Sequence, residues 1–372
     1  MKEITNKQLT EMFESGSPVT VIDVREPEAF ASWHIEGSRN IPVGASLRSG
    51  DAAPLQHAAK ELPQDRPIVA VCNAGITSQK AAQVLESLGR DSYSLIGGMR
   101  GWSLAWSEAR LALRSRPEAV FIQLRRHGKG CLSYLLGSAG AAVVVDPSLE
   151  IEVYQEIAQR EGLTITTVLE THVHADHFSR ARALCEAVGA KLLIPRNQRV
   201  TFDYTSVEHG QTIEIGNLKM QAVSTPGHTG ESTCYLIEDE ALLTGDTLFV
   251  ESVGRPDLEK GDAGAEAGAH VLYNSLHDRL LSLGESITIY PAHTGSEIGF
   301  NGKPVSATLG QIKAGVELLS ADEDSFVATI LASLSAKPPN HECVISINEG
   351  KSDLGDADPL DVEAGPNRCA AT

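Results

Sequence analysis

The sequence has no long apolar run, no excess of basic residues and no paired spacing of its six cysteines. No apolar stretch approaches the roughly 20 residues that cross a bilayer, and residues 1–5 show no apolar signal region. A formal net charge of −18 without a basic stripe argues against nucleic acid as a partner. Unpaired cysteine spacing in a long chain is weak evidence for disulfides. We therefore expect a cytoplasmic protein without a membrane partner.

The 372 residues suffice for two domains, and a hydrophobic content of 42% supports well-filled cores. We expect a first domain over residues 1–110, a junction over 111–117 and a second domain over 118–350. The acidic residues 351–372 contain Pro and Gly but little apolar content, which predicts a disordered tail in which Cys369 is incidental.

Three histidines and an aspartate fall within six positions of the second domain. The stretch at 171–177 reads Thr-His-Val-His-Ala-Asp-His. A predicted buried strand at 165–170 precedes it and a predicted helix at 179–188 follows, so these side chains lie on a turn where they can converge. Imidazole and carboxylate are usual ligands of zinc and iron. A solvated polar turn that happens to be rich in histidine is the alternative.

Three later residues argue against that alternative, because each follows an apolar strand. His228 follows the strand at 218–223, while Asp246 and His293 stand at the ends of further apolar runs. Strand ends aim side chains rigidly at one cavity. We expect the remaining histidines to be surface or helix residues and three cysteines to be plain core residues: His127, His209, His270, His277, Cys131, Cys185 and Cys234.

The seven candidate ligands resemble the metallo-β-lactamase pattern of His-x-His-x-Asp-His followed by His, Asp and His. They are His172, His174, Asp176, His177, His228, Asp246 and His293. The resemblance spans residues 118–350 and implies an αβ/βα sandwich that binds metal. It does not fix the reaction, because one fold hosts many chemistries.

The first domain alternates strands and helices, which indicates an α/β fold with a parallel sheet and flanking helices. Cys72 opens a six-residue loop before the helix at 78–88; loop amides and the helix end favour its thiolate form. An inert cysteine at a strand end is an equally good interpretation of the position alone. The remaining loop residues are Asn73, Ala74, Gly75, Ile76 and Thr77. Strands are predicted at 20–24, 67–71 and 93–96, and helices at 3–14 and 46–61.

Several motifs together resemble a single rhodanese domain over residues 1–110. The resemblance implies that Cys72 carries a sulfane sulfur as a persulfide. The loop contains no Arg or Lys, which many thiosulfate-using rhodaneses place there, so thiosulfate is not established as the donor. The motifs are Asp23-Val24-Arg25-Glu26, His34-Ile35-Glu36-Gly37-Ser38, Asn40-Ile41-Pro42, the Cys72 loop and Gly97-Gly98-Met99 with Trp102.

Two metallo-β-lactamase subfamilies fit the second domain: glyoxalase II-type zinc thioesterases and iron-dependent persulfide dioxygenases. The run Gly254-Arg255-Pro256-Asp257 is similar to the Gly-Arg-x-Asp signature of the dioxygenases. We also expect the chain to lack the helical C-terminal extension of glyoxalase II. A rhodanese domain handles sulfane sulfur, which a persulfide dioxygenase consumes, so we favour the dioxygenase.

That resemblance implies one Fe(II) per chain, held by His172, His228 and Asp246. The residues His174, Asp176, His177 and His293 would surround these ligands or hold a second metal. Arg255 would bind a substrate carboxylate or pair with Asp257. The substrates would be O2 and a low-molecular-weight persulfide such as glutathione persulfide, and the products sulfite and the free thiol, with thiosulfate if Cys72 transfers sulfur. The family also implies a homo-oligomer, such as a dimer.

Two alternatives remain open at this point. Seven ligands also suit a dinuclear zinc thioesterase fused to a sulfur-carrier domain, so the ligand count does not separate zinc from iron. A non-enzymatic module that delivers persulfide to a partner protein is the other alternative.

Overall fold

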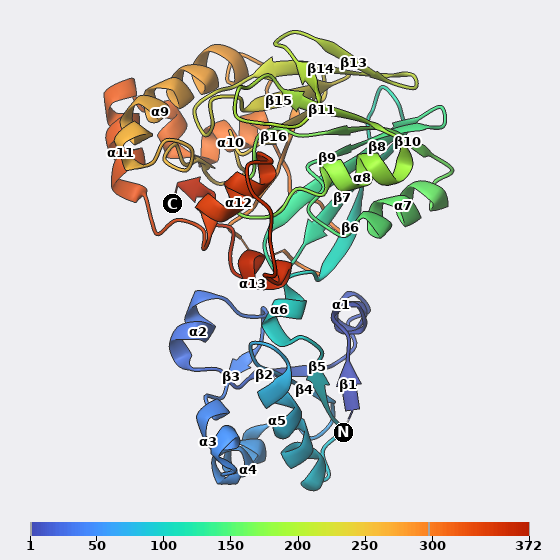
Figure 1. Cartoon of the computed structure of the whole chain (residues 1–372), viewed down its shortest axis with the longest axis vertical. Coiled ribbons are helices and arrows are strands. Elements are labelled where there is room, and N and C mark those ends of the chain that lie inside the picture. Colours follow the sequence, from blue (N-terminus) through green and yellow to red (C-terminus); the bar gives the residue numbers. More distant parts are fainter. Residues whose placement is uncertain (1, 297, 372) are drawn as a thin grey trace.

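The computed structural model describes residues 2–296 and 298–371, which form two lobes joined at a narrow waist (Figure 1). The smaller lobe holds the N-terminal domain and the larger lobe the C-terminal one. No helix in this part of the chain combines the length and the apolar content that crossing a bilayer requires.

The described part of the first domain is built on a parallel sheet of five strands in the order β1-β5-β4-β2-β3. The central strand β4, Ile-Val-Ala-Val, is buried along its whole length, as expected for a parallel sheet covered by helices on both faces. This confirms the predicted α/β class. The strands are β1 (Lys2–Ile4), β2 (Thr20–Asp23), β3 (Arg39–Asn40), β4 (Ile68–Val71) and β5 (Ser92–Leu95). The helices are α1 (Asn6–Glu14), α2 (Pro27–Ser32), α3 (Gly44–Ser49), α4 (Ala53–Ala58), α5 (Ile76–Ser87) and α6 (Gly98–Trp102), with a 3-10 turn at Ala59–Glu61.

Two helix predictions in the first domain need correction. The expected helix at 3–14 begins only at Asn6, because Thr5 and Gln8 form a capping box that starts α1 after a short strand. The expected helix at 46–61 is divided, since Gly50 ends α3 in the left-handed conformation (φ 90°) and Pro54 lies in the first turn of α4.

The second domain places two sheets face to face. The first has seven strands in the order β12-β11-β10-β9-β8-β7-β6 and the second has six in the order β13-β14-β15-β16-β18-β19, counted over the described residues. The first sheet comprises β6 (Trp106–Leu111), β7 (Val120–Arg126), β8 (Cys131–Ser138), β9 (Ala141–Val145), β10 (Thr164–Leu169), β11 (Lys191–Pro195) and β12 (Thr205–Val207). The second comprises β13 (Thr212–Ile215), β14 (Leu218–Ser224), β15 (Thr233–Ile237), β16 (Ala241–Gly245), β18 (Thr288–Pro291) and β19 (Ala307–Thr308).

Three apolar clusters hold these layers together. Side chains such as Phe121, Tyr134 and Leu243 fill the space between the sheets. A second cluster packs α7 and α8 on the first sheet, and a third packs α9, α10 and α11 on the second. The result is the expected αβ/βα sandwich (Figure 1). The helices are α7 (Ile151–Arg160), α8 (Ala181–Val188), α9 (Asp262–Ser275), α10 (Leu309–Gly315), α11 (Glu323–Ser333), α12 (His341–Asn348) and α13 (Pro359–Glu363), with a π turn at Leu276–Leu280 and a 3-10 turn at Glu317–Ser320.

Two further expectations about the second domain need correction. The chain does not lack helices after His293: α10 to α13 follow it, so the argument from a missing helical extension fails. Strand β6, placed mainly in the first domain, pairs with β7 of the second.

The C-terminal residues also differ from the prediction, because 351–371 are not a disordered tail. Strand β20 (Ala370–Ala371) pairs with β17 (Val253–Gly254). The carboxylate of Glu363 is buried between Arg126 and Arg180. Composition alone suggested disorder, but these specific pairings attach the segment to the second domain.

The two domains touch. Phe300, in the loop after β18, stacks on His127 with ring centroids 4.0 Å apart and lies 4.7 Å from the ring of Phe13 in the first domain. The indole Nε1 of Trp33 donates a hydrogen bond to the carbonyl oxygen of Gly128 at 2.6 Å.

Candidate metal centre

Three of the predicted ligands form one group of buried donors: His172, His228 and Asp246. His172 follows β10, His228 follows β14 and Asp246 follows β16, so three strand ends bring them together. The Nε2 atoms of His172 and His228 lie 3.7 and 3.6 Å from Oδ2 of Asp246. Two imidazoles and one carboxylate with open positions are typical of non-heme Fe(II) sites.

Within the described part of the chain, no hydrogen bond occupies the three atoms that face one another, which are Nε2 of His172, Nε2 of His228 and Oδ2 of Asp246. Nδ1 of His228 lies 2.7 Å from the carbonyl oxygen of Arg255, to which it donates when Nε2 is the bare nitrogen. Nδ1 of His172 lies 2.9 Å from Oγ1 of Thr171, which in turn donates to Asp146. Partners on the outer nitrogen fix the orientation of metal-binding histidines in this way.

One buried oxygen makes the strongest case that a cation fits here. Among the described residues, Oδ2 of Asp246 has no hydrogen-bond partner, although it is shielded from solvent. An uncompensated buried carboxylate oxygen is costly, and a metal ion would satisfy it. Burial lowers the pKa of both His172 and His228, which favours the neutral imidazole that binds metals.

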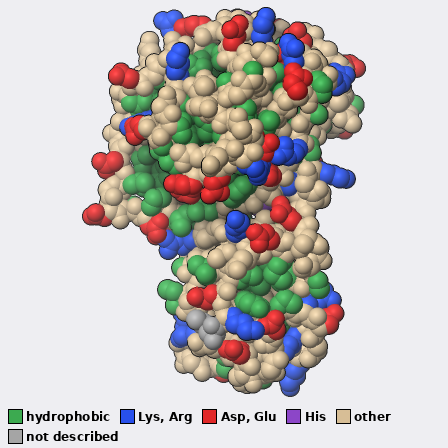
Figure 2. Space-filling view, turned by 90° about the vertical axis from the view of Figure 1, so that its right-hand side faces the viewer, with side chains coloured by type: hydrophobic (Ala, Val, Ile, Leu, Met, Phe, Trp, Pro, Cys, Tyr) green, Lys and Arg blue, Asp and Glu red, His purple; other side chains and the backbone are tan. Residues whose placement is uncertain are grey.

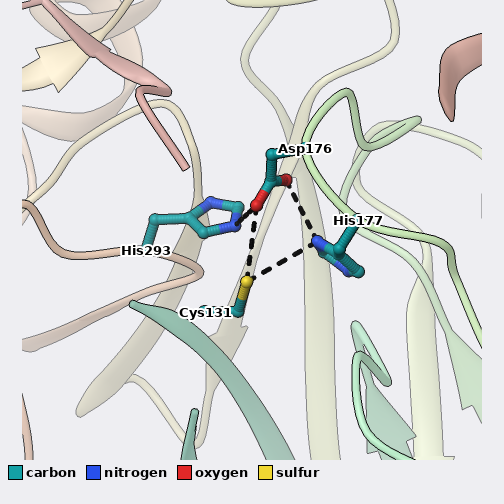
Figure 3. Close-up of side chains that lie close together, drawn as sticks. All are labelled: Cys131, Asp176, His177 and His293. Atoms are coloured by element: carbon teal, nitrogen blue, oxygen red, sulfur yellow. Dashed lines mark hydrogen bonds and ion pairs between the residues drawn. The ribbon is translucent and has the colours of Figure 1, made fainter. Parts of the chain in front are cut away.

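A second group of buried donors lies beside the first and includes a residue that the sequence did not indicate. It comprises Cys131, Asp176, His177 and His293 (Figure 3). The sulfur of Cys131 lies 3.4 Å from Oδ2 of Asp176 and 3.8 Å from Nδ1 of His177. These four side chains could also hold a metal, because each offers a donor atom within 4.8 Å of the others.

Cys131 is therefore not the plain core residue that we expected. Burial and Asp176 would raise the pKa of its thiol, but His177 and His293 outweigh them and lower that pKa to about 7. Cys131 is the first residue of an apolar strand, and this position did not indicate that it lies beside candidate metal ligands. What brings it here is a backbone bridge between Cys131 and His293, which joins the two sheets.

His174 belongs to neither group. Its Nε2 lies 3.1 Å from Oε2 of Glu170 and 3.3 Å from Oδ1 of Asp146. Burial would lower the pKa of His174, but these carboxylates raise it well above its ordinary value. The sequence analysis did not single out Asp146 or Glu170, although each closes a strand near the motif.

The substrate-binding prediction for Arg255 is wrong. Its guanidinium pairs with Asp257 at 2.7 and 3.0 Å and donates its other hydrogen atoms to the backbone carbonyls of Ser335, Ala336 and Arg368. No donor remains for a substrate. The structural alternative, the pair with Asp257, is the observed one.

The C-terminal segment closes one side of the centre. Cys369, expected to be incidental, is buried, and its sulfur lies within 4.8 Å of donor atoms of Asp246 and His293. Side-chain Nδ2 of Asn367 donates to the carbonyls of Lys129 and Thr294 at 2.8 and 3.2 Å. Asn367 thereby links the backbone just before Cys131 to the backbone just after His293, and both of these residues belong to the second donor group.

Cys72 lies at the predicted position, between β4 and α5. Its sulfur is nearly buried and lies 3.3 Å from Oγ of Ser78. Gly75 adopts φ 83°, and a Cβ atom there would lie 2.9 Å from the amide nitrogen of Gly97, so only glycine fits this approach. The amide of Met99 donates to the carbonyl of Cys72, which ties α6 to the loop.

Comparison with known proteins identifies both domains. Residues 5–105 match the rhodanese-like domain family, and residues 128–293 match the metallo-beta-lactamase superfamily. The chain is thus a rhodanese-like domain followed by a metallo-beta-lactamase domain.

Individual relatives come from more than one branch of the superfamily. The chain is 31% identical over 171 residues to the mitochondrial persulfide dioxygenase ETHE1 of Bos taurus, covering 44% of this chain and 65% of that one. It is 33% identical to a hydroxyacylglutathione hydrolase of Francisella philomiragia, covering 43% and 61%. The crystal structure of ETHE1 from Myxococcus xanthus superimposes with a TM-score of 0.55 at 28% identity, covering 62% of this chain and 99% of that one. The chain spans just under two thirds of these two curated relatives.

Proposed function

We propose that the chain oxidises a low-molecular-weight persulfide, such as glutathione persulfide, with O2 at an Fe(II) ion held by His172, His228 and Asp246. The persulfide, O2 and water give the free thiol, sulfite and two protons. The outer sulfur loses four electrons, and O2 accepts them. The observation that supports this most is the buried, unpaired Oδ2 of Asp246 facing two imidazole nitrogens.

The iron would supply the activation of O2, and the protein supplies the binding and the orientation. The carbonyl of Arg255 and the hydroxyl of Thr171 orient the two imidazoles. His293 holds Oδ1 of Asp246. Deep burial of these groups excludes bulk water, which strengthens their electrostatic interactions.

In the first domain, the thiolate of Cys72 would attack the outer sulfur of a persulfide. The new bond joins Cys72 to that sulfur, and the free thiol leaves with the electron pair of the old S–S bond. Transfer of the same sulfur to sulfite would give thiosulfate. The sulfur that would carry this group lies at the start of the loop 73–77, within 3.3 Å of the hydroxyl of buried Ser78.

The second candidate function is a thioesterase with two zinc ions. The second donor group with Cys131 favours it, as does the similarity to a hydroxyacylglutathione hydrolase. Against it, Asp176 and His177 already hydrogen-bond to each other at 3.0 Å, and Cys131 contacts both. A thioesterase also has no evident use for Cys72.

Elemental analysis of protein expressed with iron and zinc both available separates the two candidates. We expect about one iron per chain, lost in His172→Ala and Asp246→Ala and kept in the control His270→Ala, a histidine of α9 paired with Glu323. Two zinc ions per chain, with hydrolysis of an acyl-glutathione and no O2 uptake, would instead establish the thioesterase.

A further inference from the structure

A chain of buried hydroxyl groups leads from the sulfur of Cys72 into the first domain. Sγ of Cys72 lies 3.3 Å from Oγ of Ser78, and Oγ of Ser78 lies 2.9 Å from Oγ of Ser94. The hydroxyl of Ser94 is also 3.4 Å from the carbonyl oxygen of Gly75, to which it can donate. Both serines are 0% exposed, so the chain is shielded from solvent and both of its ends lie in the Cys72 loop.

Three elements of the smaller lobe, which lies below the waist in Figure 2, carry these groups. Cys72 follows the strand β4, Ser78 lies in the first turn of α5, and Ser94 lies in β5. The helix α5 packs on both strands (Figure 1). Side chains that stand on packed helices and strands are held in place more firmly than side chains on loops.

The hydrogen atoms of this chain can point in either of two directions. When Cys72 is a thiol, its S–H donates to Ser78, and the hydroxyl of Ser78 donates to Ser94. Ser94 then donates to the carbonyl of Gly75, so three hydrogen atoms serve three acceptors. A thiolate has no hydrogen atom and only accepts. Ser78 then turns its hydrogen towards the sulfur, and Ser94 donates to Ser78 over the shorter of its two distances.

Charged side chains near this edge of the sheet are already paired. The loop that follows Cys72 contains no Arg or Lys. Arg25, just after β2, forms an ion pair with Asp23 at 2.6 Å. Arg100 of α6 pairs with Asp358 and Asp361 at 2.5 and 2.8 Å. A negative charge on the sulfur therefore depends on neutral hydrogen-bond donors, of which the hydroxyl of Ser78 is one.

We propose that Ser78 donates a hydrogen bond to the ionised sulfur of Cys72, and that Ser94 is the positioning residue that turns Ser78 towards it. A hydrogen bond to the charged form favours that form, and a hydroxyl that itself accepts a hydrogen bond donates a stronger one. The inference rests on the proposed sulfur transfer through Cys72 and adds two residues to it.

The serines hold charge in both directions of the transfer and give up no proton. When the thiol of Cys72 ionises, its proton leaves to solvent, to which the residue keeps 6% exposure. When sulfite takes the sulfur, its lone pair forms the new S–S bond, and the bond between Cys72 and the outer sulfur breaks. The electron pair of that bond returns to Cys72, whose thiolate accepts the hydrogen bond of Ser78.

Ser92 provides a matched control for Ser94. It is buried in the same strand, and its hydroxyl donates to the carbonyl of Ala82 in α5 at 2.9 Å. Ser92→Ala thus removes a buried hydroxyl that ties β5 to α5, as Ser94→Ala does. The partner of Ser92 belongs to the helix backbone and not to the chain that reaches the sulfur, so this variant reports the structural cost alone.

The first test is the pH dependence of alkylation of Cys72 by iodoacetamide in the full-length chain. Mass spectrometry of the peptide that contains Cys72 separates it from the other cysteines. We expect Ser78→Ala to move the midpoint upward by about one pH unit, the effect of losing one hydrogen bond to the thiolate. Ser94→Ala should move it less in the same direction, while Ser92→Ala and Ser78→Thr, which keeps the hydroxyl, should leave it in place.

An unchanged midpoint in Ser78→Ala, or an equal shift in Ser92→Ala, would overturn the proposal. An unchanged midpoint in Ser94→Ala would overturn the role of Ser94.

The second test follows the gain of one sulfur atom by the same peptide when the chain reacts with glutathione persulfide. Ser94→Ala should load Cys72 several-fold more slowly below the midpoint and approach the unaltered chain above it, because the thiolate is then fully formed. Slowing by the same factor at every pH would refute the positioning role. If the unaltered chain gains no sulfur, the proposed transfer fails, and the alkylation profile still decides whether the serines stabilise the thiolate.

Discussion

Nδ1 of His293 lies 2.6 Å from Oδ1 of Asp246, and Nε2 of the same ring lies 3.1 Å from Oδ2 of Asp176. One imidazole therefore joins the two donor groups. Because His293 holds Oδ1, the other oxygen of Asp246 faces His172 and His228. Burial would lower the pKa of His293, but the two carboxylates raise it well above its ordinary value.

We propose that His293 positions Asp246 at the metal centre. We expect His293→Ala to weaken iron binding by roughly 10- to 100-fold, as the loss of a group that orients a ligand commonly does. Competition with an iron chelator measures the affinity. The control His270→Ala should bind iron normally; unchanged affinity in His293→Ala would show that Asp246 needs no such support.

Cys131 contacts Asp176 and His177 but none of the three proposed iron ligands. We expect Cys131→Ala to keep about one iron per chain and to lower the free energy of unfolding by about 1–3 kcal/mol, because a buried carboxylate loses a donor. Urea unfolding and elemental analysis give the two values. The control Cys185→Ala replaces a half-buried cysteine of α8 and should lower the free energy of unfolding by less. Loss of iron would place Cys131 among the ligands instead.

Cys72 should be needed for sulfur transfer and not for oxidation. In Cys72→Ser we expect transfer of sulfane sulfur from glutathione persulfide to sulfite to disappear, while O2 uptake with the same persulfide remains. The control Cys343→Ser replaces an exposed thiol of α12 and should change neither activity. If transfer survives without the Cys72 thiol, another group carries the sulfur.

The buried Glu363 should determine whether the C-terminal segment stays attached. Glu363→Gln leaves Arg126 buried without its charged partner, and we expect a loss of about 3–5 kcal/mol in the free energy of unfolding. Asp361→Asn, which removes an exposed pair with Arg100, should cost at most about 1 kcal/mol. Similar losses of unfolding free energy in the two variants would mean that the buried ion pair of Glu363 contributes little to stability.

The same carboxylate predicts a dependence of stability on acid. Burial alone would raise the pKa of Glu363, but Arg126 and Arg180 lower it to about 2 from 4.5. The unfolded chain then binds a proton before the folded one, so stability present above pH 4.5 is lost as the pH falls towards 2. The difference in unfolding free energy between the unaltered chain and Glu363→Gln should shrink by about 3 kcal/mol over this range.

The sequence predicted most of what depends on local pattern. Buried runs such as the one before Cys72 and the one before His172 appear as strands. His172, His228 and Asp246 came together as expected.

What the sequence did not predict depends on pairing between distant segments. The place of Cys131 follows from a bridge to His293, which no local pattern encodes. The burial of Glu363 requires Arg126 and Arg180, both far away in the chain. Arg255 looked available for a substrate, yet partners from 80 to 113 residues away occupy it.

The most direct measurement is the amount of O2 consumed against the amount of sulfite formed, with glutathione persulfide and the iron-loaded chain. The account predicts one O2 for each sulfite, with both lost in Asp246→Ala. Cys72→Ser should be used in parallel, so that sulfur transfer does not remove the sulfite. Sulfite formation without O2 consumption, or no turnover by iron-loaded protein that hydrolyses acyl-glutathione with zinc, would contradict it.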